Sequence, residues 1–236
     1  MAERKVRKFA RANGTRLSRL RLLFIHIPKT AGTSVIEVLK ESPGYSCVDS
    51  HQRLIRWVQS GEAESTEILT LDHLSTDVLV RSGLTSKEEL GKVDSFAVLR
   101  DPRDRLWSAY RQNYGRRIPS SWSFQEYVRR VPNHRRAIEF SNMCGLSHGL
   151  PATTWIRPRN WAGPKSLFHF AHLERLERYL SQALQRKVLL PKLNSAAAHL
   201  PQLSEKELPK CVQWPKRFER SYALDFAILA AIEKGE

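Results

Sequence analysis

One apolar run, closed by a proline and followed by a short polar loop, constrains the fold of this chain most. Residues 22–27 read LLFIHI, an unbroken apolar segment suited to a β-strand buried on both faces. The loop that follows Pro28 contains Lys29, Thr30, Ala31, Gly32, Thr33 and Ser34, and an apolar helix start over residues 35–39 comes next. A strand, a tight loop and a helix in this order direct backbone N–H groups and a positive helix end at an anion. The segment therefore predicts a phosphate-binding loop. It is not the Walker A pattern GxxxxGK[ST], because its lysine precedes the glycine.

Further strands and helices alternate along the chain. Strands are predicted over residues 67–71, 94–99 and 167–170, and helices over residues 103–117, 174–185 and 222–232. Strands separated by helices favour the α/β class, here a P-loop-like parallel β-sheet flanked by helices on both faces. A chain of 236 residues is long enough for one large domain. We place this single domain over residues 22–236, after a basic and flexible N-terminal arm over residues 1–21.

Positive charge is the unusual feature of the composition. The chain has 39 Lys and Arg against 24 Asp and Glu, a net charge of +15. Residues 1–21 hold eight of these basic residues and a single acid, Glu3. Such an arm is either a solvated charge run or a segment that contacts an anionic polymer, a membrane surface or nucleic acid. The sequence leaves these alternatives open.

Several classes of protein are excluded. The three cysteines, Cys47, Cys144 and Cys211, lie far apart without a CxxC pair, which argues against a disulfide framework or a zinc ribbon. No cluster of acids or histidines has metal-ligand spacing, so we expect no metal. The longest apolar run is far shorter than the roughly 18–20 residues of a transmembrane helix. We therefore expect no transmembrane segment and a cytoplasmic protein.

A second motif closes the strand over residues 94–99. Residues 98–110 read VLRDPRDRLWSAY, which places Arg100 at the strand end and Ser108 eight residues later on the next helix. This segment resembles the 3′-phosphate-binding motif of sulfotransferases that use 3′-phosphoadenosine 5′-phosphosulfate (PAPS). Residues 24–34, FIHIPKTAGTS, resemble their 5′-phosphosulfate loop. The nearest resemblance is to the branch with uronyl 2-O-sulfotransferases and small bacterial carbohydrate sulfotransferases, and it covers about residues 22–232.

The resemblance implies a PAPS-dependent sulfotransferase that releases 3′-phosphoadenosine 5′-phosphate (PAP). Sulfuryl transfer is an in-line displacement that depends on positioning and electrostatic stabilisation and needs no metal. Lys29 is then catalytic, because it can stabilise the oxygen that bridges sulfur and the departing phosphate. The remaining donor-binding residues hold the 5′-phosphate or the 3′-phosphate, and the guanidinium of Arg100 suits the latter. They are Thr30, Ala31, Gly32, Thr33 and Ser34 for the first, and Arg100 and Ser108 for the second.

A general base must take the proton of the acceptor hydroxyl, and histidine has a suitable pKa. We select His73, which follows a predicted strand at the edge where an open sheet displays site residues. The branch also places a histidine between the two motifs, and His51 is the competing choice. His26 lies inside the first strand and is interpreted as a packing residue. The resemblance further implies a carbohydrate acceptor near Lys192 and Asn194, and the sequence leaves open whether this acceptor is anionic.

Two alternatives belong to other classes. A P-loop kinase-like phosphotransferase would need a Walker lysine, which this sequence lacks. A non-catalytic nucleic-acid-binding protein would explain the net charge, but no nucleic-acid motif accompanies that charge and we expect no nucleic acid partner. The arginines of the helix after Arg100 form either a solvated face or one border of an anionic acceptor groove. Arg103, Arg105 and Arg111 belong to this group.

Overall fold

The computed structural model describes residues 2–72, 74–114, 118–131, 146–156, 163–193 and 212–235. The chain divides into two compact units, which are described separately. We call the first the sheet unit; it comprises residues 1–27, 31–98 and 153–191. We call the second the helical unit; it comprises residues 28–30, 99–152 and 192–236.

A five-stranded parallel sheet forms the centre of the sheet unit. Its strands are β1 (Leu22–His26), β2 (Tyr45–Val48), β3 (Ile68–Asp72), β4 (Asp94–Leu99) and β5 (Ser166–His169), in the order β2-β3-β1-β4-β5. Every residue of β1 is buried, as expected for an apolar run at the middle of a parallel sheet. Strand β1 pairs in parallel with β3 and β4, and the register places His26 beside Asp72. The carboxyl ends of β1 and β3 therefore meet at one edge of the sheet.

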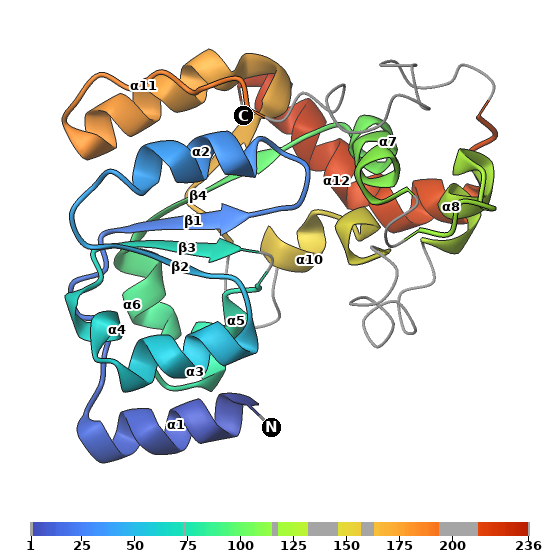
Figure 1. The fold of residues 1–236 in the computed structure, drawn as a ribbon. Coiled ribbons are helices and arrows are strands. Elements are labelled where there is room, and N and C mark those ends of the chain that lie inside the picture. The colour runs from blue at the N-terminus through green and yellow to red at the C-terminus, as the bar shows by residue number, and fades with distance from the viewer. Residues whose placement is uncertain are drawn as a thin grey trace. The chain divides into compact units, whose positions relative to one another are not determined.

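Helices cover both faces of this sheet (Figure 1). Helices α2 (Gly32–Leu39) and α11 (Leu173–Leu184) lie over one face, and α3 (His51–Gln59), α5 (Asp77–Arg81) and α6 (Lys87–Lys92) lie over the other. The short elements α4 (Glu62–Ser65), α10 (Thr153–Ile156) and η2 (Phe170–His172) complete the unit. Leu22 and Phe24 pack with α2 and α11, whereas Leu23 and Ile25 point to the opposite face because side chains alternate along a strand. The predicted α/β class and its flanking helices are confirmed.

The N-terminal segment differs from the flexible arm expected over residues 1–21. Residues Ala2–Asn13 form helix α1, which lies against α3 (Figure 1). Val6 and Ala10 stand four residues apart on one face of α1 and are buried, while the Arg7 Nε donates a hydrogen bond to the Arg81 carbonyl at 2.6 Å. This apolar stripe fixes the helix although basic residues surround it in the sequence. The domain boundary at residue 22 stays a prediction.

Strand β2 was not predicted. Its four residues, YSCV, contain no apolar run, and only Val48 is buried. At the edge of a sheet a strand needs one covered face and one pairing partner, so its sequence can be short and polar. Parallel pairing with β3 holds it in place.

Aromatic side chains form the core of the helical unit. Its elements are α7 (Pro102–Asn113), α8 (Phe124–Arg130), η1 (Leu146–Gly149) and α12 (Lys216–Lys234). The buried aromatic residues are Trp107, Tyr110, Phe124, Tyr127, Phe218 and Tyr222. Helix α7 begins where Pro102 predicts a first turn, and the Asp101 carboxylate caps it by accepting hydrogen bonds from the Arg103 and Asp104 amides at 2.8 and 3.3 Å. This cap fixes the direction in which the chain leaves Arg100.

Candidate active site

The loop between β1 and α2 has an unusual backbone. Lys29 and Ala31 both adopt positive φ angles, 71° and 65°, which are uncommon for residues other than glycine. Each residue in such a conformation destabilises the folded state by on the order of 1–3 kcal/mol. Residues of this kind are frequent at ligand-binding and active sites. Ala31 also occupies the N-cap position of α2, where its methyl side chain offers no hydrogen-bond acceptor to the first-turn amides. Two left-handed residues therefore stand in the loop directly before α2, whose first-turn amides receive no side-chain cap from Ala31.

At the carboxyl ends of β1 and β3, the sheet unit holds a part-buried polar pair. The His26 Nδ1 donates a hydrogen bond to the Asp72 Oδ1 at 2.5 Å, and the two side chains are 10% and 25% exposed. A methyl group placed on Gly32 would lie 1.7 Å from the His26 Nε2. Gly32 is therefore required here because the His26 ring occupies the space that any side chain at residue 32 would need.

In the helical unit, the positive charges of Lys29, Arg100 and Arg111 act on one another. Burial, followed by the positive charges of Arg100 and Arg111, lowers the pKa of Lys29 to about 8. Burial also lowers the pKa of Arg100, an effect that Asp104 and Asp101 oppose and that Arg105 and Arg111 reinforce. Cations repel one another at short range, so this repulsion favours an anionic ligand that neutralises them.

The three cations and the loop motif agree with a comparison of the whole sequence. The sequence pattern of the sulfotransferase family matches residues 16–213. The chain belongs to the sulfotransferase family. Membership makes it a PAPS-dependent transferase. No curated protein matches the chain.

One similar solved structure is a sulfotransferase from Alicyclobacillus acidocaldarius, described by its crystal structure. The two chains are 13% identical, and the match covers 91% of this sulfotransferase and 96% of the other chain, with a TM-score of 0.45.

Arg111 was not singled out in the sequence, yet its positive charge contributes to lowering the pKa of Lys29. The sequence placed it on a solvated face or at the border of a groove, but it is only 8% exposed. It follows Ser108 by three residues on α7, so the two side chains lie on the same side of the helix. Its guanidinium carbon lies 5.8 Å from the centre of the Trp107 ring, a cation–π distance. The three-residue spacing from Ser108 was the signal available in the sequence.

The other predicted site residues are more scattered. Thr30 and Ser34 are buried and Thr33 is exposed, while Ser108 is half-buried on α7. His51 is the first residue of α3 and is exposed; it follows β2, which is two strands away from β1 in the sheet. Lys192 is exposed in the helical unit. His73 and Asn194 lie outside the described residues.

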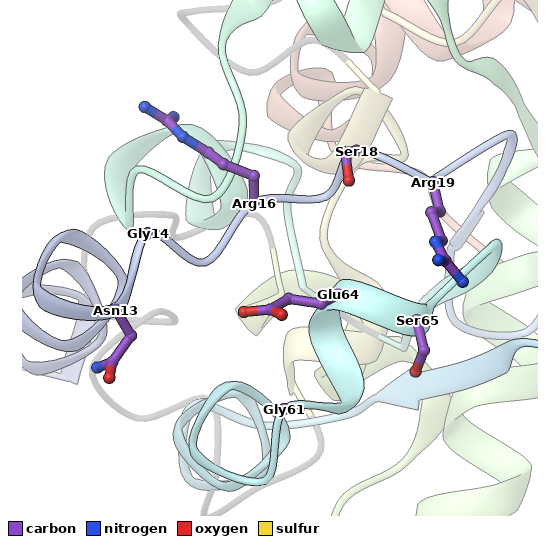
Figure 2. A pocket seen from close by; sticks show the side chains of 8 residues that line it. All are labelled: Asn13, Gly14, Arg16, Ser18, Arg19, Gly61, Glu64 and Ser65. Carbon is purple, nitrogen blue, oxygen red and sulfur yellow. The ribbon is translucent and has the colours of Figure 1, made fainter.

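A polar surface pocket in the sheet unit is separate from the loop (Figure 2). It is lined by Asn13, Gly14, Arg16, Ser18, Arg19, Gly61, Glu64 and Ser65. These segments lead into the first residues of β1 and β3, so the pocket lies at the amino edge of the sheet, opposite the loop. Arg16 points away from Glu64 and donates a hydrogen bond to the Gly83 carbonyl at 3.1 Å. The pocket therefore belongs to the junction between α1 and the sheet.

Within the described residues, no helix is long and apolar enough to cross a membrane. The same residues contain no group of three or more His, Cys, Asp or Glu side chains placed to hold a metal ion.

Proposed function

We propose that this sulfotransferase moves the sulfuryl group of PAPS to the hydroxyl of a carbohydrate by in-line, metal-independent transfer. The observation that carries the proposal is the half-buried Lys29, whose pKa is lowered to about 8 first by burial and then by the positive charges of Arg100 and Arg111. PAPS brings a 5′-phosphosulfate and a 3′-phosphate, and these three cations suit a ligand with this much negative charge. The choice of a carbohydrate rests on the resemblance of the two motifs to the uronyl 2-O branch.

Each donor-binding residue has a proposed role. The loop from Thr30 to Ser34 holds the 5′-phosphate through backbone N–H groups and hydroxyls. Lys29 stabilises the oxygen that bridges sulfur and phosphorus as its bond to sulfur breaks and the acceptor oxygen bonds to sulfur. Arg100 and Ser108 bind the 3′-phosphate, and Arg111 adds a third positive charge on the α7 side.

The base that accepts the hydroxyl proton is proposed to be His73. It follows Asp72, the last residue of β3, at the carboxyl edge where parallel sheets bind ligands. His51 remains the competing choice. On the acceptor side, Lys192 and Asn194 stay proposals drawn from the resemblance, and the exposed position of Lys192 is compatible with contact to an anionic sugar.

The choice between the two histidines has a direct test. His73→Ala should abolish most turnover while PAP affinity changes little, because a base contacts the acceptor and not the nucleotide. His51→Ala is the matched variant and should retain turnover. Steady-state rates with PAPS and calorimetric titration with PAP measure both quantities. If His51→Ala removes turnover and His73→Ala does not, the two assignments are exchanged.

The donor assignment is tested by the preference for PAP over AMP, which differ in the 3′-phosphate. Wild-type protein should bind PAP much more tightly than AMP. Loss of one charge-assisted contact costs about 1.5–3 kcal/mol, or roughly 10–150-fold in affinity. Arg100→Ala should therefore lower the affinity for PAP by about this factor and leave the affinity for AMP almost unchanged. Ser108→Ala should also lower the affinity for PAP, by a smaller factor.

Calorimetric titration of both nucleotides into each variant measures this preference. Arg129 on α8 is exposed, so Arg129→Ala serves as a control for the loss of one positive charge. A wild-type protein that binds ATP or AMP as tightly as PAP would overturn the proposed donor. If Arg100→Ala still prefers PAP over AMP, the 3′-phosphate is recognised by another residue.

A further inference from the structure

The His26–Asp72 pair occupies a central position in the sheet unit. His26 is the last residue of β1 and Asp72 the last residue of β3, and the parallel register places them side by side. The His26 ring also stacks on Phe24, with ring centres 5.7 Å apart and planes inclined by 18°. The ring is therefore held by a hydrogen bond at Nδ1 and by stacking on Phe24, and its orientation is defined.

The opposite edge of this ring faces the start of α2. A methyl group on Gly32 would lie 1.7 Å from the His26 Nε2, 2.0 Å from Cδ2 and 2.3 Å from Cε1. These three ring atoms are the nearest neighbours of that position. The imidazole thus lies directly against the backbone at the first residue of α2, in the middle of the segment from Thr30 to Ser34.

The loop needs support at this point. Ala31, immediately before Gly32, adopts a left-handed conformation, and so does Lys29. Strained residues keep such conformations only when the surrounding structure holds them in place. A rigid ring pressed against Gly32 limits how far this part of the loop can move toward the sheet.

A packing role alone does not require this pair. A buried carboxylate and imidazole are costly to desolvate, and well-packed apolar side chains of similar size often stabilise a core as well or better. Asp72 also directly precedes His73, the proposed base. The pair thus links the donor loop to the segment that carries the base.

We propose that His26, oriented by Asp72, is a positioning residue that fixes the donor loop through its contact with Gly32. Through this contact it sets the affinity for the 5′-phosphate and not for the 3′-phosphate. The inference rests on the proposed function, in which the loop from Thr30 to Ser34 binds the 5′-phosphate.

The contact itself is tested by a double-mutant cycle measured by urea unfolding. Gly32→Ala should lower the unfolding midpoint, because its methyl group collides with the ring. In the His26→Ala background, Gly32→Ala should lower the unfolding midpoint much less, because the ring atoms with which the methyl group collides are absent. Equal costs of Gly32→Ala in the two backgrounds would overturn the contact and the inference with it.

The positioning role is tested with two nucleotides. PAP carries both phosphates, whereas adenosine 3′-monophosphate lacks the 5′-phosphate. His26→Asn keeps an N–H group near the position of Nδ1 for Asp72 but removes the ring atoms that face Gly32. His26→Asn should lower the affinity for PAP by about tenfold, which is the effect of losing one contact. The affinity for adenosine 3′-monophosphate should not change. Asp72→Asn should shift the same preference in the same direction.

Four outcomes are distinguishable. A selective loss of PAP affinity in folded variants supports the positioning role. Equal losses for both nucleotides would reveal general structural damage, and unchanged affinities would reveal passive packing; either result overturns the inference and leaves the proposed function intact. Wild-type protein that does not prefer PAP over adenosine 3′-monophosphate would overturn the loop's proposed role, and the inference with it.

Discussion

Lys29→Ala should lower the turnover number by about 10²–10³, the usual loss when one transition-state donor is removed. The ammonium group of Lys29 is proposed to stabilise charge that develops only as the bridging bond breaks. PAP affinity should fall much less, because Arg100 and Arg111 still supply positive charge. Steady-state rates with PAPS and calorimetric titration with PAP separate the two effects. If the Lys29→Ala variant keeps near-normal turnover, Lys29 does not stabilise the transition state and the proposed catalytic role is wrong.

The pH dependence of PAP binding offers a second test of the same side chain. The pKa of Lys29 is about 8 because of burial and the charges of Arg100 and Arg111, and a bound polyanion would raise it. Between the second phosphate pKa of about 6 and the pKa of Lys29, the side chain of Lys29 already carries its proton, so the affinity for PAP should vary little. Above pH 8 binding must take up a proton, and affinity should fall by up to about tenfold per pH unit. Lys29→Arg should flatten this fall, because a guanidinium stays charged.

Arg105→Met should destabilise the protein by about 3–5 kcal/mol, the cost of breaking a buried ion pair from one side. The side chain is fully buried on α7, and its guanidinium donates hydrogen bonds to the carbonyls of His148, at 3.0 Å, and Leu150. It also lies 4.0 Å from the Asp225 carboxylate, which accepts a hydrogen bond from the Ala152 amide at 2.6 Å. Removal of Arg105 takes one cationic partner from the buried Asp225 carboxylate and one donor each from the carbonyls of His148 and Leu150.

Urea unfolding measures this effect, and the exposed Arg129→Met on α8 is the control, with an expected change within about 0.5 kcal/mol. Arg105→Met combined with Asp225→Leu should recover part of the loss, because no charge is then left unpaired. A cost of Arg105→Met as small as that of the control would show that the network contributes nothing to stability.

Local sequence patterns predicted those parts of the fold that depend on neighbouring residues. The apolar run at residues 22–27 identified the buried central strand, and Pro102 identified the start of α7. Helix α1 was missed because its basic residues obscure Val6 and Ala10, which alone form its buried stripe.

Contacts between distant residues could not be predicted in this way. His26 and Asp72 are 46 residues apart, and only the pairing of β1 with β3 brings them together. For the same reason, neither the hydrogen bond between His26 and Asp72 nor the steric requirement for Gly32 could be predicted from the sequence. The sequence left open whether Arg111 lies on a solvated face or at the border of a groove, and its burial became known only from the folded chain.

Helix α1 also changes how the excess positive charge acts at a distance. Charges on a mobile tether are spread over the whole volume that the tether explores, so their field favours no single face of the protein. On a helix fixed against α3, the exposed side chains of Arg4, Lys5, Lys8 and Arg11 give the sheet unit a field with a constant direction. Such a field guides anionic molecules during diffusional encounter and weakens over the Debye length, about 8 Å at physiological ionic strength. The N-terminal helix thereby makes the rate at which a polyanion approaches this face sensitive to salt.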